Sequence, residues 1–472
     1  MTKKIKKICC IGAGFVGGPT MAVIADKCPN IIVNVVDINK ERIKNWNDKD
    51  LAKLPIFEPG LKEIIKRCRN KNLFFSSNVE EQISSADMIF ISVNTPTKER
   101  GIGAGQASDL KWVEISAREI SKFAKSGTIV VEKSTLPVKT AQTINNILKY
   151  SKNNEDDSNL KKKFTVLSNP EFLAEGTAIN DLVNPDRVLI GGEDNEAINS
   201  LKELYLNWVD KDKILTTNLW SSELSKLIAN ALLAQRISSI NSFSALCEAT
   251  DADIKDVSLA VGLDKRIGKY FLNAGPGFGG SCFKKDILNL IYICNHYRLN
   301  EVSAYWQKVL DVNDWQQKRI TTIIVDKLFG TISGKKLAIF GFAFKANTND
   351  TRESPSKNIC LELLEEGAHL SIYDPQVMNH QIAADLNMEE RKLLSCDSKS
   401  GGWEKALCKE DAVKDSDAII ILTEWEEFKV IDWDLYSSLM RSPSWVFDTR
   451  YICNLKEAKN SGFNVWCVGY GK

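Results

Sequence analysis

Near its start the 472-residue sequence reads Ile8-Cys9-Cys10-Ile11-Gly12-Ala13-Gly14-Phe15-Val16-Gly17, in which a short apolar strand pattern runs into three spaced glycines. A helix pattern follows at 19–27, and a β-branched strand pattern at 31–36 ends at Asp37. A strand, a glycine-rich turn, a helix and a second strand form a βαβ unit, in which the two strands are parallel. The segment therefore predicts the first unit of a doubly wound α/β domain.

The glycine spacing indicates what this unit binds. Gly12 allows the tight turn, Gly14 leaves room for a pyrophosphate, and Gly17 lets helix and strand pack closely. The N–H groups at the helix N-terminus bind phosphate. Asp37, 25 residues after Gly12, is expected to accept hydrogen bonds from the adenosine ribose and to repel a 2′-phosphate. We therefore expect NAD as the cofactor, held by Gly12, Ala13, Gly14, Phe15, Val16, Gly17 and Asp37, with Arg42 near the adenine; Arg42 could instead serve NADP, which Asp37 disfavours.

The remaining patterns divide the chain into three parts. Strand patterns at 88–93, 128–131, 164–167 and 188–190 complete a predicted nucleotide-binding domain over 1–219, with a charged, exposed loop at 152–163. Helix patterns at 221–248, 253–261 and 286–328 predict a helical central domain over 220–332 that connects the parts before and after it. Strand patterns return at 337–341, 370–374, 418–423 and 446–448, which predicts a second doubly wound domain over 333–472. Its turn, Gly341-Phe342-Ala343-Phe344-Lys345, lacks the glycines for a second pyrophosphate, and 387–415 is predicted to be an exposed excursion.

Composition excludes several classes of function. Lys+Arg 62 against Asp+Glu 61 give a net charge of +1, which argues against general binding of nucleic acid or membrane. No apolar run approaches the ~20 residues of a membrane span, and the apolar run after the basic start is too short for a signal peptide. The 12 cysteines form no C-x-x-C pair, so we expect reduced thiols in a cytoplasmic protein and no metal site.

Cys282 lies in Gly277-Phe278-Gly279-Gly280-Ser281-Cys282-Phe283-Lys284-Lys285-Asp286. Glycines allow close approach of backbone and substrate, and nearby ammonium groups favour the thiolate, which is the nucleophile. Taken alone, this thiol is better explained by a small buried cysteine in a glycine-rich turn. Combined with a bound hydride acceptor, it indicates oxidation through a covalent thioester.

These motifs closely resemble those of the UDP-glucose/GDP-mannose dehydrogenase family. Besides the segments at 11–18 and 277–286, the resemblance rests on motifs that span nearly the whole chain in family order: Val93-Asn94-Thr95-Pro96-Thr97, Glu132-Lys133-Ser134-Thr135, Asn169-Pro170-Glu171-Phe172-Leu173-Ala174-Glu175-Gly176, Asn184-Pro185-Asp186-Arg187, Ser222-Glu223-Leu224-Ser225-Lys226, Gly341 to Lys345 and Asp350-Thr351-Arg352-Glu353-Ser354.

The resemblance implies oxidation of UDP-glucose at C6 to UDP-glucuronate, a four-electron reaction that consumes two NAD. It implies that Cys282 forms a thiohemiacetal and then a thioester, that Lys226 and Asn230 stabilise oxyanion charge, that Asp286 and Thr135 organise a water, and that Glu171 is the base for hydrolysis. It also implies further contacts to NAD from Val93, Asn94, Thr95, Pro96, Thr97, Ser134, Thr135, Glu175, Lys285 and Arg352. The implied substrate contacts are Glu171, Phe172, Leu173, Ala174, Glu175, Lys226, Asn230, Arg266, Phe271, Gly277, Phe278, Gly279, Phe344, Lys345 and Arg450.

The family resemblance further implies a homo-oligomer, either a dimer or a hexamer built as a trimer of dimers, in which Arg266 reaches a neighbouring subunit's site. Sister enzymes that oxidise GDP-mannose or a UDP-N-acetylhexosamine would keep the fold, NAD and Cys282, and they remain the nearest alternative. A non-catalytic regulator that binds NAD and a UDP-sugar is disfavoured because Cys282, Lys226, Asp286 and Thr135 occur together. Asp37 disfavours an NADPH-dependent reductase.

Overall fold

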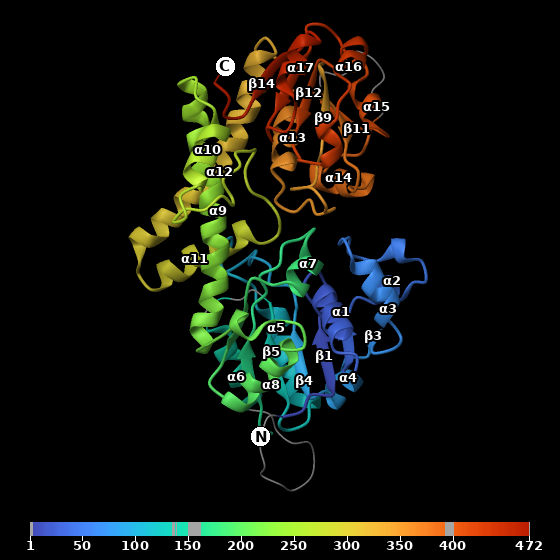
Figure 1. Cartoon of the computed structure of the whole chain (residues 1–472), viewed down its shortest axis with the longest axis vertical. Coiled ribbons are helices and arrows are strands. Elements are labelled where there is room, and N and C mark those ends of the chain that lie inside the picture. The colour runs from blue at the N-terminus through green and yellow to red at the C-terminus, as the bar shows by residue number, and fades with distance from the viewer. Residues whose placement is uncertain (1–2, 135–136, 138, 150–161, 392–400, 472) are drawn as a thin grey trace. The chain divides into compact units, whose positions relative to one another are not determined.

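The computed structural model describes residues 3–134, 137, 139–149, 162–391 and 401–471 (Figure 1). The chain divides into two compact units. The first unit comprises 1–229 with 288–297, and the second comprises 230–287 with 298–472. Thr135 and most of the expected loop at 152–163 lie outside the described residues. The three-part division at residues 219 and 332 stays a prediction.

The first unit is built on a sheet of eight strands in the order β3-β2-β1-β4-β5-β6-β7-β8. All neighbours are parallel except β6 and β7, so the last two strands run opposite to the first six. The strands, in chain order, are β1 (Lys7–Ile11), β2 (Ile32–Val36), β3 (Leu73–Ser76), β4 (Met88–Ile91), β5 (Ile129–Glu132), β6 (Thr165–Ser168), β7 (Val188–Gly191) and β8 (Ile214–Thr217). The predicted doubly wound α/β fold is confirmed, although the sequence patterns missed β3 and β8.

Helices cover both faces of this sheet (Figure 1). Because side chains alternate along a strand, Ile8 and Cys10 of β1 pack in one apolar core, whereas Cys9 and Ile11 pack in another. The first core includes Met21 of α1, and the second includes helices on the opposite face. The helices are α1 (Gly17–Lys27), α2 (Lys40–Asn47), α3 (Leu61–Cys68), α4 (Val79–Ser85), α5 (Lys111–Phe123), α6 (Thr140–Lys149), α7 (Ala178–Val183) and α8 (Asn195–Tyr205).

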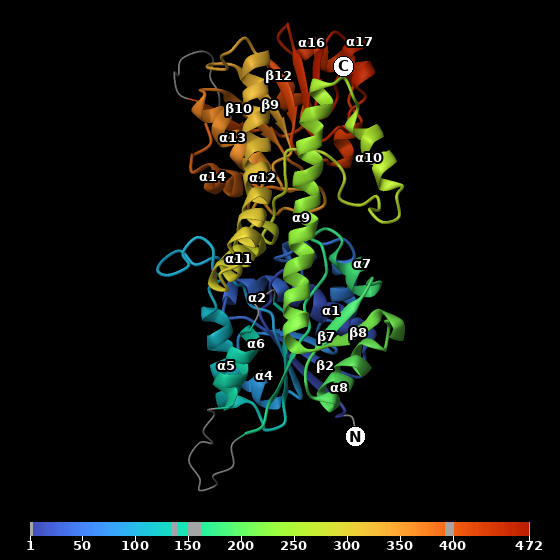
Figure 2. The same ribbon diagram turned by 90° about the vertical axis from the view of Figure 1, so that its left-hand side faces the viewer.

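Long helices follow where the sequence predicts them. The pattern at 221–248 is helix α9 (Leu219–Ala249), the long helix in Figure 2, and the pattern at 253–261 is α10 (Ile254–Gly262). The pattern at 286–328 forms two helices, α11 (Phe283–His296) and α12 (Asn300–Lys327), and Arg298 between them adopts a positive φ of 59°. Both α9 and α11 contribute residues to the first and the second unit.

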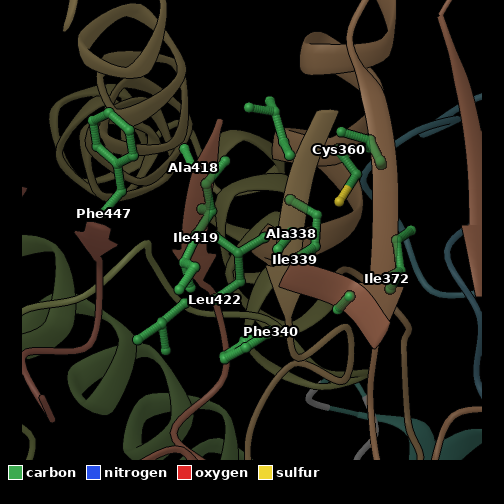
Figure 3. Packing of buried hydrophobic residues seen from close by; sticks show 14 of the residues in the cluster. Ala338, Ile339, Phe340, Cys360, Ile372, Ala418, Ile419, Leu422 and Phe447 are labelled. Carbon is green, nitrogen blue, oxygen red and sulfur yellow. The ribbon is translucent and has the colours of Figure 1, made fainter. Parts of the chain in front are cut away.

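The second unit contains a parallel sheet in the order β11-β10-β9-β12-β13-β14. Its strands are β9 (Lys336–Phe340), β10 (His369–Tyr373), β11 (Gly402–Lys405), β12 (Ala418–Ile421), β13 (Trp445–Asp448) and β14 (Asn464–Cys467), and its helices are α13 (Pro355–Glu365), α14 (Asn379–Leu386), α15 (Lys409–Val413), α16 (Trp433–Leu439) and α17 (Leu455–Asn460). Figure 3 shows Ile339 of β9, Ile372 of β10 and Ile419 of β12 packed in its core with Cys360 of α13. The second predicted doubly wound domain is therefore confirmed.

One expectation for this unit is wrong. The segment 387–415 is not an exposed excursion in its described part, because β11 and α15 both lie within it. Strand β11 pairs with β10, and Trp403 is 0 % exposed, with its indole N–H donating to the carbonyl oxygen of Met388. A single tryptophan among Gly, Ser and Lys residues gives too weak a pattern to reveal an edge strand.

Candidate active site

In the glycine turn after β1, two glycines are needed for backbone packing and a third leaves open space. Gly12 has a φ of +109°, and a Cβ atom there would lie 2.2 Å from the carbonyl oxygen of Ser92. A Cβ atom on Gly17 would lie 2.1 Å from the carbonyl oxygen of Gly12, so both positions require glycine for the fold itself. A Cβ atom on Gly14 would meet nothing within 4 Å. Gly14 lies three residues before the start of α1, and the open space beside it fits the pyrophosphate of a dinucleotide.

Asp37 follows β2 and lies beside this turn. Its Oδ2 accepts hydrogen bonds from the backbone N–H of Ala13 and from Nη1 of Arg42, both at 2.9 Å. Its Oδ1 accepts from the backbone N–H of Asn39. The structure thus brings Asp37 and the glycine turn together at Ala13, and their roles toward NAD stay predictions. Arg42 is bound to the carboxylate, which draws its guanidinium toward the expected ribose position.

Two further expected cofactor segments lie at the ends of β4 and β5. Residues Val93 to Thr97 follow β4, and Ser134 follows β5. Oγ of Ser134 donates to the carbonyl oxygen of Val93 at 2.8 Å, so the two strand ends are joined directly. Thr95 is buried. These segments and the glycine turn follow neighbouring parallel strands, which is where doubly wound sheets bind nucleotides.

The segment after β6 brings together Glu171, Phe172 and Lys226. Nζ of Lys226, on helix α9, lies 3.2 Å from Oε1 of Glu171, and both side chains are about 5 % exposed or less. Lys226 also lies 5.5 Å from the centre of the Phe172 ring. The other oxygen of Glu171 accepts from the backbone N–H of Leu173. The sequence predicted these residues for one site, and the first unit places them in contact.

Residues that the sequence analysis missed hold this segment in place. Glu58 is 5 % exposed, and its carboxylate accepts hydrogen bonds from the backbone N–H groups of Gly176 at 2.8 Å and Ala178 at 3.2 Å. Asp181 accepts from the backbone N–H of Ala174 and from Thr177. The guanidinium of Arg187 lies 3.9 Å from the ring centre of Phe172. Arg187 could have been found from the sequence, because it ends the family motif at 184–187. No motif or spacing near Glu58 indicated its role.

In the second unit, glycines let the segment before Cys282 pack tightly. A Cβ atom on Gly277 would lie 2.6 Å from Oδ1 of Asn313, which accepts the backbone N–H of Phe278. A Cβ atom on Gly279 would lie 2.5 Å from the carbonyl oxygen of Glu353. The backbone N–H of Gly280 donates to the carbonyl oxygen of Arg352. These contacts fix the backbone on which the Cys282 thiol is mounted.

Cys282 is half-buried and directly precedes helix α11, whereas most of the other described cysteines are fully buried in the cores. The first turn of α11 carries Asp286, whose Oδ2 accepts from Nδ2 of Asn230 at 2.6 Å. Nζ of Lys285 lies 3.8 Å from Oδ1 of Asp286. The second unit therefore brings Asn230, Lys285 and Asp286 together beside the cysteine segment. The N-terminus of a helix and a nearby ammonium group both stabilise a thiolate.

The remaining expected substrate residues also lie in the second unit. Arg450 donates to the carbonyl oxygens of Leu422 at 2.7 Å and Phe344 at 3.1 Å, and it pairs with Glu424. Nζ of Lys345 lies 5.5 Å from the ring centre of Phe344, and Phe271 packs edge-on against Phe283. Arg352, which is expected to contact the cofactor, pairs with Asp350. Arg266 is different, because its side chain is 90 % exposed and pairs with Asp264.

Three kinds of feature are absent from the described part of the chain. It has no helix whose length and apolar content would let it cross a membrane. Within the same residues, no three His, Cys, Asp or Glu side chains gather in a way that would hold a metal ion. The described cysteines are thiols and form no disulfide.

Comparison with known proteins gives consistent results along the chain. Residues 6–209, 220–315 and 338–455 match the NAD binding domain, the central domain and the UDP binding domain of the UDP-glucose/GDP-mannose dehydrogenase family. The chain is 53% identical to UDP-glucose 6-dehydrogenase 4 of Arabidopsis thaliana, over 98% of this chain and 97% of the relative. It is also 53% identical to UDP-glucose 6-dehydrogenase of Drosophila melanogaster, over 98% and 96% of the two chains. The solved structure of a UDP-glucose dehydrogenase from Pyrobaculum islandicum is similar at a TM-score of 0.81 and 29% identity, over 99% and 98% of the two chains.

The glycine geometry predicts that Gly14→Ala weakens NAD binding, whereas Gly17→Ala lowers the stability of the fold. Gly14→Ala should leave the Tm within about 2 °C and weaken NAD binding about tenfold or more, since the added methyl group enters the space for the pyrophosphate. Gly17→Ala should lower the Tm by roughly 5–10 °C because its methyl group meets backbone. Calorimetry with NAD and thermal unfolding measure the two effects. Equal losses of Tm would show that Gly14 serves the fold instead.

Proposed function

The chain belongs to the UDP-glucose/GDP-mannose dehydrogenase family, and we propose that it completes its reaction through a thioester on Cys282. It is an NAD-dependent oxidoreductase that oxidises UDP-glucose, as its full-length relatives at 53% identity are UDP-glucose 6-dehydrogenases. Relatives that share the fold but are named for N-acetylated sugars are only 22–23% identical. The alternative sugars therefore have weaker support than UDP-glucose.

The position of Cys282 is the observation that carries the proposal. It is half-buried at the start of α11, on a backbone that Gly277 and Gly279 allow to pack tightly. NAD, when bound, accepts one hydride from the substrate carbon, so oxidation of an alcohol to a carboxylate consumes two NAD. The first hydride transfer leaves an aldehyde at C6. The Cys282 thiolate then adds to that carbon and gives a thiohemiacetal, the second hydride transfer gives a thioester, and water releases the carboxylate and restores the thiol.

Lys226 and Asn230 are proposed to stabilise negative charge on the oxygen at C6. Both lie on α9 four residues apart, a spacing that places side chains on the same face of a helix. The Lys226 ammonium group is nearly buried, and a cation in a site with little water stabilises an oxyanion strongly. Glu171 partly balances that charge at 3.2 Å, so the buried cation is not isolated.

Hydrolysis of the thioester needs a base and an oriented water. We assign the base to Glu171, whose carboxylate is fixed by Lys226 and by the backbone N–H of Leu173. Asp286 is proposed to orient the water together with Thr135, which lies outside the described residues. The hydrogen bond from Asn230 to Asp286 supports this role, because it sets the direction of the carboxylate.

The nucleotide-sugar is proposed to bind through Phe271, Gly277, Phe278, Gly279, Phe344, Lys345 and Arg450, and through the segment Glu171 to Glu175. Lys345 and Arg450 supply positive charge for a diphosphate. Arg450 is held by two backbone carbonyls, which fixes its planar guanidinium. The family match to a UDP binding domain over 338–455 supports this assignment.

We also propose a homo-oligomer of at least two subunits. Apolar side chains of α9, of α10 and of the residue that follows α10 are strongly exposed in the second unit, namely Leu232 (48%), Phe243 (52%), Leu246 (58%), Leu259 (66%) and Leu263 (75%). An exposed apolar surface of this kind is typical of a subunit interface. A dimer would bury this surface, and a hexamer of three dimers is the larger alternative.

The free thiols support the proposed cytoplasmic location, since a reducing compartment preserves thiols.

The thioester route predicts two NADH for each UDP-glucose consumed. The second hydride transfer requires the covalent adduct on Cys282, and hydrolysis makes the sequence irreversible. Absorbance of NADH together with chromatography of the sugar nucleotides gives the ratio, and NADP should give little turnover because of Asp37. A yield of one NADH with free aldehyde as the product would overturn the thioester.

Cys282→Ser should lower turnover by roughly 10³-fold or more while affinity for UDP-glucose, measured by calorimetry, changes little. A hydroxyl is a poorer nucleophile and leaving group than a thiol, so the reaction should stall as a serine ester or as bound aldehyde. Intact-protein mass spectrometry detects the ester. Cys408→Ser, at an exposed cysteine, is the matched control and should keep full turnover. Normal turnover of Cys282→Ser would show that another residue is the nucleophile.

Subunit mixing tests the proposed place of Arg266. If Arg266 completes a neighbouring subunit's site, a mixture of Arg266→Ala and Cys282→Ala proteins should regain part of the activity that each lacks alone, because some mixed interfaces hold one intact site. Subunit exchange is verified by native mass spectrometry. Exchange without any recovery would place Arg266 in its own subunit's site or outside the site.

A further inference from the structure

Two buried glutamates of the first unit are unused by the proposed chemistry. Glu132 is the last residue of β5 and is 2 % exposed, and Glu223 lies on α9 and is 3 % exposed. The two carboxyl groups lie close enough to share a proton, and Oε2 of Glu132 is buried without any other hydrogen-bond partner among the described residues. Buried carboxyl groups in contact are costly unless one of them is neutral. Glu223 lies three residues before Lys226 on α9, which makes the pair relevant to the site.

We propose that Glu132 and Glu223 form a carboxylic acid–carboxylate pair that positions Lys226, with the single proton of the pair on Glu132. This inference rests on the proposed function only through the role of Lys226. Neither glutamate is expected to touch substrate or cofactor, so both are positioning residues.

Hydrogen-bond donors and acceptors locate the proton. An ionised carboxylate only accepts hydrogen bonds, so two ionised carboxylates cannot bond to each other. Both oxygens of Glu223 already accept backbone N–H groups, Oε2 from Lys139 at 2.7 Å and Oε1 from Ala141 at 2.8 Å. Those donors lie at the start of helix α6, where negative charge is stabilised. Glu223 is therefore the carboxylate, and Glu132 donates to it.

The electrostatic surroundings agree with this assignment. Burial, with the nearby charge of Glu223, raises the pKa of Glu132 well above its ordinary value. Burial also raises the pKa of Glu223, but the two backbone N–H groups and Glu132 act in the opposite direction. The two environments thus favour a neutral carboxylic acid at Glu132 and an ionised carboxylate at Glu223, as in other buried carboxyl pairs.

The strand register shows what the pair holds. Glu132 of β5 and Ser168 of β6 are direct partners in the sheet. The consecutive residues Ser222 and Glu223 of α9 bind those two partners, since Oγ of Ser222 lies 3.0 Å from Oγ of Ser168. One turn later Lys226 contacts Glu171, which follows β6. The start of α9 is thereby fixed to two neighbouring strand ends, which sets where the Lys226 ammonium group lies.

Infrared spectroscopy tests the proton directly. The wild-type protein at neutral pH should show the carbonyl stretch of a protonated carboxylic acid, and the difference spectrum against Glu132→Gln should contain that band. The matched control Glu63→Gln removes an exposed carboxylate of α3 and should not change the band. If no such band disappears in Glu132→Gln, both groups are ionised or the proton lies elsewhere, and the proposal is overturned.

Kinetics test the positioning. A glutamine at 132 still donates to Glu223, so Glu132→Gln should keep kcat within about twofold. Glu223→Gln turns an amide toward an N–H donor of α6, and it should lower kcat about tenfold or more with little change in the KM for NAD, because a small displacement of a catalytic group is costly. Equal loss in both variants, or normal kcat in Glu223→Gln, would overturn the proposal.

Lys226→Ala separates this inference from the proposed function. If Lys226→Ala keeps normal kcat, the proposed role of Lys226 is wrong and the positioning fails with it, whatever Glu223→Gln does. If Lys226→Ala is impaired but Glu223→Gln is not, the proposed function stands and only the positioning by the pair is overturned. Thermal unfolding of each variant shows whether a loss of kcat reflects unfolding.

Discussion

The common direction of six neighbouring strands is the constraint on which the first unit depends. Because β1, β2, β4, β5 and β6 all end at the same edge of the sheet, the polar residues that follow them gather there. The glycine turn, Asp37, Ser134 and Glu171 each follow a different strand, and α9 is attached to the same edge through Glu223. A strand end gives each group a fixed backbone, while the loop beyond it leaves the choice of side chain open.

The sequence predicted those features whose signal is a pattern or a spacing along the chain. The glycine turn, Asp37 and the segment around Cys282 were found because spacing along the chain alone specifies them, and strand patterns were clear where both faces are buried. Glu58 was missed because its hydrogen-bond partners lie 118 and 120 residues away, which no local pattern reveals. Glu132 and Glu223 fell within recognised motifs, but only the fold shows that they meet. Edge strands such as β3 and β8 were missed because they are short and partly exposed.

In both sheets, an aspartate after the second strand accepts hydrogen bonds from the turn that follows the first strand. In the first unit Asp37, after the second strand, accepts the backbone N–H of Ala13 in the glycine turn. In the second unit Asp374, after β10, accepts the backbone N–H groups of Phe342 and Ala343 in the corresponding turn. Phe342 is fully buried there, so its side chain occupies this turn. The same local hydrogen bond thus supports a turn open to a ligand in one unit and a packed turn in the other.

The segment 171–178 is fastened by the fold itself. Glu58 and Asp181 hold its backbone, and Arg187 packs on Phe172. A flexible loop that orders on binding loses conformational entropy at that moment, and this loss subtracts from the affinity. Here the ordering has already occurred during folding, at the expense of the stability of the first unit. If this segment contacts the nucleotide-sugar as proposed, the entropic cost of ordering it belongs to folding and not to each binding event.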